Sequence, residues 1–405
     1  MSLPKKLNIF VHRASECLTD HESHGDGLIC FSLLNGLAER GHHIYAYANT
    51  APIRSCSPNL HIKAGQHKVP ANSLGPWEQA WRAERWMKEL ERNTNFDLVW
   101  RMHPYSGGCP TVPKTNEKPL VVGPLFYGWP DPLGGTPKSG RPRLGIGLQS
   151  IVRPIAERGW EQTLSAASLI FCSTGPHAEL VQQQHPAANV RELPVIVDPP
   201  PGTKGHAAHT DSDAKNVTLL FVANLVKYKN PMIFCETIQR LRAAGINATG
   251  TLLGDGSERP ALEAYCAAQG LKNAVCFRGK VPNSAVYEAL SEADFLVSTS
   301  VGEPYGRGIA EAMSVGTPAV CHHSGGPADF ICDGINGLLV DSLTADAYAA
   351  RLQSAMSNPN AWNMLSGSAR QKAEHWCTDV VLDALETQLY RILSHSSLNV
   401  TRTIS

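Results

Sequence analysis

The segment best able to do chemistry is 298–318, with the sequence STSVGEPYGRGIAEAMSVGTP. Its loop contains three glycines: Gly302, Gly306 and Gly308. Glycines let a ligand approach the backbone, and a helix that begins near Gly308 directs amide donors and the positive end of its dipole toward an anion. Glu303 in the loop and Glu311 about one turn into the helix add carboxylates, which accept hydrogen bonds from sugar hydroxyls. A nucleotide sugar offers both features, because its phosphates are flanked by two polyols.

The elements that position this segment are predicted in two sets. Short apolar runs alternate with amphipathic stretches on both sides of residue 200, as in parallel strands joined by helices. Residues 199–215 interrupt the alternation with proline, glycine and polar residues. We therefore expect an α/β protein with two Rossmann-like, doubly wound domains at 1–198 and 216–375, joined by a linker at 199–215. Residues 376–405 are expected to form a C-terminal helix.

The stretch from Glu303 to Pro318, EPYGRGIAEAMSVGTP, resembles the retaining GT-B glycosyltransferases of glycosyltransferase family four, the glycosyl transferases group 1. That family's signature is two glutamates separated by seven residues, the second followed by Ala-Met and then Gly-x-Pro, as here. The resemblance covers the second domain and, more loosely, the first. It implies two domains that face each other across a cleft, with the donor bound by the second and the acceptor by the first. It also implies a last helix that packs back on the first domain.

By this resemblance, Glu311 holds the ribose hydroxyls of the nucleotide and Glu303 holds hydroxyls of the donor sugar. Backbone amides around Tyr305, Gly306 and Arg307 contact the sugar or the pyrophosphate. The simpler alternative is that both glutamates lie on a solvated helix face.

The family also has an arginine and a lysine after the first strand of the second domain, whose charges neutralise the leaving diphosphate. In the sequence FVANLVKYKNP, residues 221–231, Lys229 occupies the lysine position and Asn224 stands where the arginine is expected. Asparagine carries no charge, so stabilisation of the leaving group would depend more on Lys229 and on helix dipoles. Arg307 is the nearest candidate for a replacement arginine. The alternative for Lys229 is a solvated surface lysine.

Three further segments of the second domain resemble parts of the family's donor site. Gly254 and Gly256 form a tight turn that lines the nucleotide pocket in the family. Lys280 and Val281 lie in a segment that, in the family, runs along the nucleotide base and recognises it through backbone atoms. The sequence SGGPAD, 324–329, resembles a further family element that usually ends in glutamate, and Asp329 keeps the charge on a shorter arm.

In the first domain, Gly25 and Gly27 are expected in the loop between the first strand and helix, where the resemblance brings them toward the donor phosphates. His103 matches the family's histidine at a strand end and would accept a hydrogen bond at the reaction centre. Tyr127 and Trp129 follow another strand in an aromatic, glycine-containing loop, which suits an acceptor wall because aromatic faces stack on sugar rings. A packed or exposed imidazole and an ordinary hydrophobic loop are the alternatives.

Composition limits the partners. The chain of 405 residues has 36 basic and 36 acidic residues, so it lacks the positive excess of a nucleic-acid binder. Its 11 cysteines form no CxxC pair, which argues against a zinc ribbon or a disulfide framework.

With no signal peptide or apolar run long enough for a membrane span, we expect a cytoplasmic protein. The basic segment 138–158 leaves open an anionic acceptor or a peripheral membrane contact.

We therefore predict a metal-independent retaining hexosyltransferase that uses a nucleotide sugar, with a UDP-linked donor favoured over a GDP-linked one. No cofactor is expected, and the one Asp-x-Asp triplet, Asp211 and Asp213, falls in the polar linker. The acceptor would be a carbohydrate, a lipid-linked sugar or a small molecule. The alternatives are a nucleotide-sugar epimerase of the same fold and a non-catalytic nucleotide-sugar-binding protein.

Overall fold

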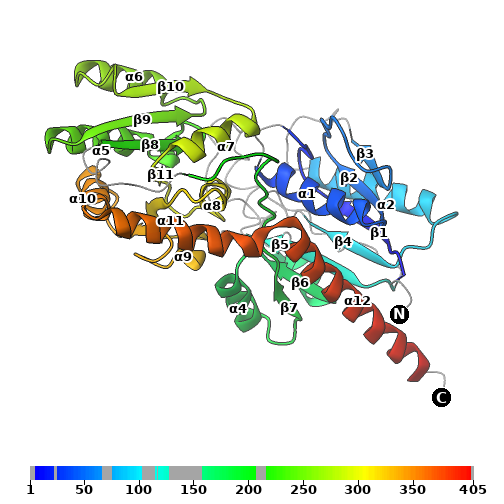
Figure 1. Ribbon diagram of the computed structural model, residues 1–405. Coiled ribbons are helices and arrows are strands. Elements are labelled where there is room, and N and C mark those ends of the chain that lie inside the picture. Colours follow the sequence, from blue (N-terminus) through cyan, green and yellow to red (C-terminus); the bar gives the residue numbers. More distant parts are fainter. Residues whose placement is uncertain are drawn as a thin grey trace. The chain divides into compact units, whose positions relative to one another are not determined.

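The computed structural model describes residues 5–21, 25–65, 75–102, 115, 117–126, 157–206 and 216–402. The chain divides into two compact units (Figure 1). Unit 1 comprises Met1–Ile196 and Thr378–Ser405, and unit 2 comprises Val197–Cys377. Among the described residues, no helix combines the length and the apolar character that a membrane span requires.

Unit 1 is built on a parallel sheet with the strand order β3-β2-β1-β4-β5-β6-β7. Its strands are β1 (Asn8–Arg13), β2 (His43–Ala48), β3 (Leu60–Ala64), β4 (Leu98–Arg101), β5 (Leu120–Leu125), β6 (Leu169–Cys172) and β7 (Val190–Glu192). Its named helices are α1 (Gly25–Glu39), α2 (Gly75–Leu90), α4 (Gly175–Gln184) and α12 (Thr378–Arg402). The order reverses between β1 and β4, which is the feature that defines a doubly wound sheet.

The first strand and helix show how the sequence produces this layer. Residues 9–11 of β1 are fully buried, as expected for a parallel strand that is covered on both faces. The glycine segment 25–27, predicted as a loop, is instead the first turn of α1. Asp26 explains the early start, because a carboxylate in the first turn complements the helix dipole. It also accepts a hydrogen bond from Ser15 Oγ at 3.2 Å.

His12 is a buried polar residue of β1, with only 3% of its surface exposed. Burial, together with the nearby charges of Arg101 and Arg13, lowers the pKa of its imidazole from 6.5 to about 3. The folded protein therefore keeps this side chain neutral at pH values where the unfolded chain protonates it.

The low pKa of His12 predicts a pH dependence of stability. Between pH 6.5 and 3 the unfolded chain binds one more proton than the folded one, so stability falls as pH falls, by about 1.4 kcal/mol per pH unit. Urea unfolding of the wild type and of His12→Asn from pH 7 to 5 measures this, since the other titrating groups cancel in the comparison. Equal pH slopes in the two proteins would contradict the prediction.

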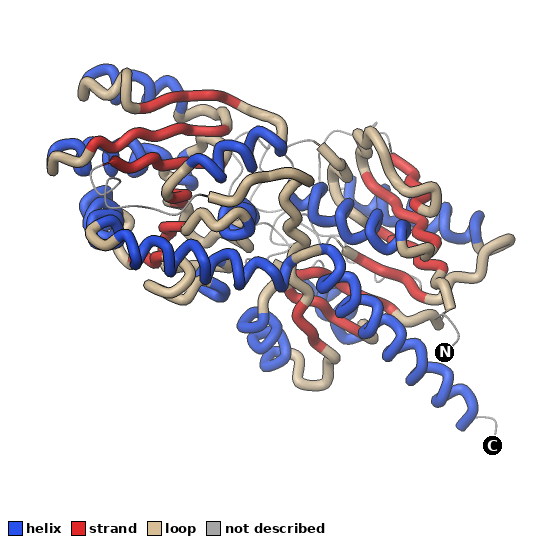
Figure 2. The backbone as a smooth tube through the Cα atoms, in the orientation of Figure 1, coloured by secondary structure: helices blue, strands red, loops and turns tan. Residues whose placement is uncertain are grey.

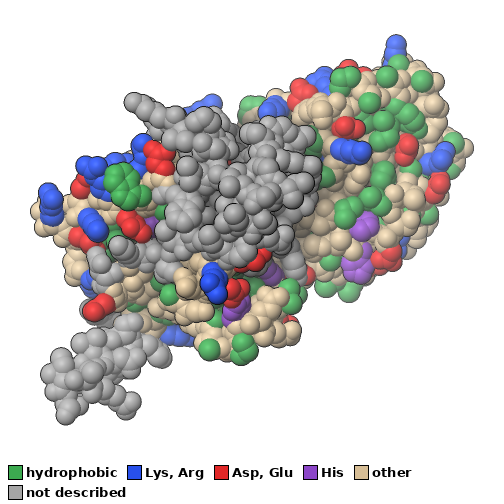
Figure 3. All heavy atoms as spheres, turned by 180° about the vertical axis from the view of Figure 1, so that it is seen from behind, with side chains coloured by type: hydrophobic (Ala, Val, Ile, Leu, Met, Phe, Trp, Pro, Cys, Tyr) green, Lys and Arg blue, Asp and Glu red, His purple; other side chains and the backbone are tan. Residues whose placement is uncertain are grey.

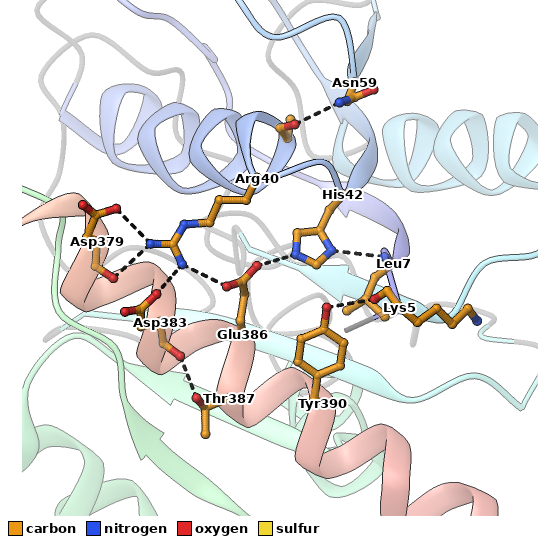
Figure 4. Close-up of polar contacts among 11 residues, drawn as sticks. Lys5, Leu7, Arg40, His42, Asn59, Asp379, Asp383, Glu386, Thr387 and Tyr390 are labelled. Atoms are coloured by element: carbon orange, nitrogen blue, oxygen red, sulfur yellow. Dashed lines mark hydrogen bonds and ion pairs between the residues drawn. The ribbon is translucent and has the colours of Figure 1, made fainter. Parts of the chain in front are cut away.

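The C-terminal helix α12 packs on α1 in unit 1 through a dense polar network (Figure 4). Arg40, just after α1, pairs with Asp379 at 3.0 Å, Asp383 at 2.6 Å and Glu386 at 2.9 Å. His42, whose side chain is fully buried, accepts the Leu7 N–H at Nδ1, so its Nε2–H donates to Glu386 at 2.6 Å.

This network is expected to hold α12 in place. Removing the Arg40 guanidinium leaves Glu386, which is four-fifths buried, without its cation, and we expect Arg40→Ala to cost about 1–3 kcal/mol. Amide hydrogen exchange should then speed up along the first turns of α12. The control is Arg85→Ala, which removes an exposed i,i+4 pair with Glu89 on α2 and should cost less than about 0.5 kcal/mol. Equal exchange in Arg40→Ala and wild type would show that the network does not anchor the helix.

Unit 2 has a second parallel sheet, with the order β10-β9-β8-β11-β12-β13. Figure 2 shows its strands in red among helices in blue. Its strands are β8 (Asn216–Val222), β9 (Asn247–Leu253), β10 (Val275–Gly279), β11 (Phe295–Ser298), β12 (Ala319–His322) and β13 (Leu338–Val340). The α-helices are α5 (Pro231–Ala243), α6 (Arg259–Ala268), α7 (Asn283–Glu292), α8 (Arg307–Ser314), α9 (Pro327–Phe330), α10 (Ala345–Met356) and α11 (Pro359–Ala373). Two 3₁₀ turns complete it, η2 (Lys227–Lys229) and η3 (Glu374–Trp376).

The first half of the predicted linker is part of unit 2. The His206 N–H donates to the Val315 carbonyl at 3.0 Å, and the Val197 N–H donates to the Trp376 carbonyl at 2.9 Å. Segment 199–206 has few apolar side chains, and it is held by these backbone hydrogen bonds and by the His206 ring, whose centroid lies 4.7 Å from that of Trp362. Residues 207–215 lie outside the described residues.

Acidic and basic side chains are mixed on the face drawn in Figure 3. The described part of this face shows no large area of a single charge sign, in keeping with the equal numbers of acidic and basic residues.

Candidate functional site

The predicted donor residues of unit 2 come together because they follow the carboxyl ends of parallel strands, which share one edge of the sheet. Lys229 follows β8, the Gly254 turn follows β9, and Lys280 follows β10. Glu303 follows β11, and the glycine pair 325–326 follows β12. The topology of unit 2 therefore gathers segments that are up to about 100 residues apart in the chain.

Lys229 and Glu303, predicted separately, form an ion pair between Lys229 Nζ and Glu303 Oε2. Both side chains are largely buried, with 13% and 21% exposure. The Thr299 hydroxyl at the end of β11 donates to the carbonyls of Lys229 at 2.7 Å and Asn230 at 2.9 Å. Asn230 Nδ2 donates in return to the Thr299 carbonyl at 3.1 Å. This exchange fixes η2 against β11, so the lysine is held in the site rather than extended into solvent.

Glu311 lies on the inner face of α8, and only 5% of its surface is exposed. Its Oε1 lies 3.0 Å from Nε of Arg307, one helical turn earlier. Burial raises the pKa of the Glu311 carboxyl, and the Arg307 charge opposes that rise. The solvated-face alternative therefore fails for Glu311. The same pair directs Arg307 at Glu311, whereas the sequence had suggested it as a replacement cation for a diphosphate.

The start of α8 has the geometry of an anion-binding helix end. Gly306 is the N-cap residue in the left-handed conformation, with φ of 89°, and α8 begins at Arg307, one residue before the predicted Gly308. A side chain at Gly306 would be strained there, so glycine is the residue that fits. Tyr305, next to this cap, is buried against Phe330, with ring centroids 5.4 Å apart.

Sequence reasoning missed the role of Ser324 and the glycine pair after β12. The Gly302 N–H donates to Ser324 Oγ at 3.0 Å, and the Gly326 N–H donates to the Glu303 carbonyl at 2.9 Å. A Cβ on Gly325 would lie 2.4 Å from that same carbonyl oxygen. These residues support the loop that carries Glu303, and the Gly-Gly sequence directly after a strand was the available signal. Asp329, which ends the SGGPAD sequence, lies in the first turn of α9.

The turn after β9 packs tightly against the segment after β8. A Cβ on Gly254 would lie 1.9 Å from the Ala223 carbonyl oxygen, and one on Gly256 would lie 2.2 Å from the Leu225 carbonyl oxygen. Both glycines are therefore required by close backbone approach. Asn224 lies between these contacts with its side chain exposed.

The remaining predicted positions are less enclosed or are not described. Lys280 is exposed, and Val281 beside it is half-buried. In unit 1, Gly25 is exposed and Gly27 is buried, both in the first turn of α1. His103, Tyr127 and Trp129 lie outside the described residues, as does the Asp211/Asp213 triplet. Within the described ranges, His, Cys, Asp and Glu side chains form no group of three or more that could hold a metal ion.

Comparison with known proteins identifies the family of the second unit. Residues 206–372 match the family described as glycosyl transferases group 1. The match covers most of unit 2 and none of unit 1. The group-1 resemblance seen in the sequence is thereby confirmed, although the narrower assignment to family four stays a prediction.

A curated relative agrees with this match, and solved structures share the fold. The chain is 27% identical over 245 residues to D-inositol 3-phosphate glycosyltransferase from Geodermatophilus obscurus, covering 56% of this chain and 53% of that protein. It thus spans about half the length of this curated relative. Its fold resembles sucrose-phosphate synthase from Thermosynechococcus elongatus, with a TM-score of 0.69, 17% identity, and coverage of 97% of this chain and 100% of that one. It also resembles Anabaena Alr3699/HepE in complex with UDP and glucose, with a TM-score of 0.63, 16% identity and coverage of 95% and 100%. The predicted GT-B fold is confirmed.

Proposed function

We propose that this protein transfers a hexosyl unit from a nucleotide sugar to an acceptor hydroxyl, with retention of the anomeric configuration. The observation that carries the proposal is the pairing of Lys229 with Glu303 on two strand-end loops of unit 2, together with the buried carboxylate of Glu311 on α8, within the part of the chain that matches the glycosyl transferases group 1. These groups supply a cation for a leaving diphosphate and two acceptors for polyol hydroxyls.

The roles follow from the chemistry of each group. Glu311 accepts hydrogen bonds from the ribose hydroxyls, and its burial makes each such bond strong because water does not compete. Glu303 accepts hydrogen bonds from the donor sugar, and Lys229 stabilises charge as the bond from the anomeric carbon to the phosphate oxygen breaks. Backbone amides at the start of α8 share that task. The acceptor oxygen attacks the anomeric carbon on the same face, and its proton passes to the released phosphate oxygen.

Asn224 makes Lys229 more important in this protein. Asparagine offers no positive charge at the position where the family has arginine. Lys229, at the family's lysine position, is then the side-chain cation that we assign to the leaving group.

We favour a UDP-linked donor, and a reaction that needs no metal. UDP is the nucleotide in the complex of Anabaena Alr3699/HepE, a protein of similar fold, and this supports the choice. Lysine and helix amides can replace the cation that other transferases use to neutralise a diphosphate.

A titration with UDP, GDP and ADP, followed by thermal unfolding with and without EDTA, tests the donor site. We expect UDP to raise the melting temperature, with the same shift in EDTA. No shift with any nucleotide would overturn the proposed function. An epimerase would convert the donor without an acceptor, and a non-catalytic binding protein would give no turnover, so product analysis with and without acceptor separates the three.

A further inference from the structure

Two buried arginines meet in unit 1 at the ends of neighbouring strands. Arg13 ends β1, Arg101 ends β4, and the two residues are register partners in the parallel sheet. They are 6% and 2% exposed. They lie where the strand order reverses, at the carboxyl edge, which is where open α/β sheets bind their ligands.

A break in the strand register places His12 beside them. The pairing runs from Val11 with Trp100 directly to Arg13 with Arg101, so His12 is an extra residue without a partner in β4. Bulges of this kind are common next to active sites because they re-aim a side chain.

The imidazole of His12 is an unused hydrogen-bonding group. It is 97% buried, and neither ring nitrogen has a hydrogen-bond partner among the residues that the structure describes. A neutral imidazole carries one N–H donor, and a buried donor without a hydrogen-bond partner destabilises the folded protein. A ligand that accepts this hydrogen bond would remove that destabilisation.

The charges that act on His12 are those of the two arginines. Burial, with the guanidinium groups of Arg101 and Arg13, lowers the pKa of His12 to about 3. Arg101 is also oriented, since one of its terminal nitrogens (NH1) donates to Thr163 Oγ1 at 3.3 Å and that hydroxyl donates to the Gly159 carbonyl at 2.7 Å. Two such arginines present planar forks of N–H donors, which match the oxygens of a phosphate or a carboxylate.

We propose that Arg13, Arg101 and His12 form a binding site for an anionic group, a phosphate or a carboxylate, carried by the acceptor. This inference rests on the proposed transferase function, because the donor phosphates already have Lys229 and the α8 end in unit 2. It narrows the acceptor class to molecules with an oxyanion, and a neutral sugar or alcohol would be a poor acceptor.

Binding of inorganic phosphate, and in a second arm acetate, to the protein saturated with UDP tests the site directly by calorimetry. We expect saturable phosphate binding that Arg13→Gln and Arg101→Gln weaken at least tenfold. If acetate binds more tightly than phosphate, the anionic group of the acceptor is a carboxylate. Arg191→Gln, an exposed arginine on β7 of the same unit, is the control and should bind phosphate like the wild type.

Three results would overturn the inference. One is the absence of saturable binding of either anion to the wild type. Another is equal phosphate affinity in Arg13→Gln and in the control. The third is a loss of UDP affinity in Arg13→Gln as large as its loss of phosphate affinity, which would assign the cluster to the donor's diphosphate. Arg13→Lys keeps the charge but not the fork, and intermediate phosphate affinity in that variant supports the geometry even if a glutamine variant fails to fold.

The same titrations distinguish this inference from the proposed function. UDP binding without anion binding leaves the transferase proposal standing and removes the anion site. Anion binding without binding of any nucleotide removes the transferase proposal and keeps a site for an oxyanion in unit 1.

Discussion

Replacing Lys229 by alanine is expected to lower kcat by about 100- to 1,000-fold, the range seen when one group that stabilises transition-state charge is removed. The effect should lie toward the upper end, because Asn224 supplies no second cation. Binding of UDP should weaken much less, since the lysine acts mainly on charge that develops as the donor bond breaks. Steady-state kinetics with a UDP-sugar, alongside UDP titration, measures both quantities.

Lys227 is the matched control for this experiment. It lies in the same 3₁₀ turn, two residues before Lys229, and its side chain is exposed. Lys227→Ala should therefore keep wild-type kcat. Equal losses in the two variants would mean that the turn, and not the charge paired with Glu303, matters for catalysis.

Replacing Glu311 by alanine is expected to weaken UDP binding by about 10- to 150-fold, the equivalent of about 1.5–3 kcal/mol for hydrogen bonds to a charged group. The carboxylate is 95% buried, so a ribose hydroxyl bonded to it does not compete with bulk water. Its loss also leaves Arg307, at 3.0 Å, without its acid, and we expect a lower melting temperature. Calorimetric titration with UDP and thermal unfolding measure the two effects separately.

Two comparisons sharpen the test of Glu311. Glu288→Ala removes an exposed glutamate from α7 and should change neither UDP affinity nor melting temperature. Glu311→Gln keeps the shape and one hydrogen-bond acceptor, so its UDP affinity should lie between those of the wild type and the alanine variant. Unchanged UDP affinity in Glu311→Ala would remove this residue from the nucleotide site.

The sequence by itself determined the class of fold and singled out 302–311 as the candidate donor segment. Continuous apolar runs separated by amphipathic helices predict buried parallel strands, because strands covered on both faces have no polar side. The glycines and glutamates of 302–311 are local in the chain, and their spacing on a loop and one helical turn already indicates a site for phosphates and polyols. These features depend on neighbouring residues, so sequence periodicity and spacing are enough to find them.

Contacts between distant parts of the chain were decided by the tertiary structure. Lys229 and Glu303 are 74 residues apart, and the parallel strand order of unit 2 alone brings them into one ion pair. Arg307 pairs with Glu311, which is buried on α8, whereas the sequence also allowed Arg307 to face a diphosphate.

The basic cluster of unit 1 depended on the tertiary structure most of all. Arg13 and Arg101 are partners through the register of β1 and β4, and a one-residue bulge adds His12 to them. Register and bulges follow from how whole strands pack side by side in the sheet, and no local pattern in the sequence specifies them.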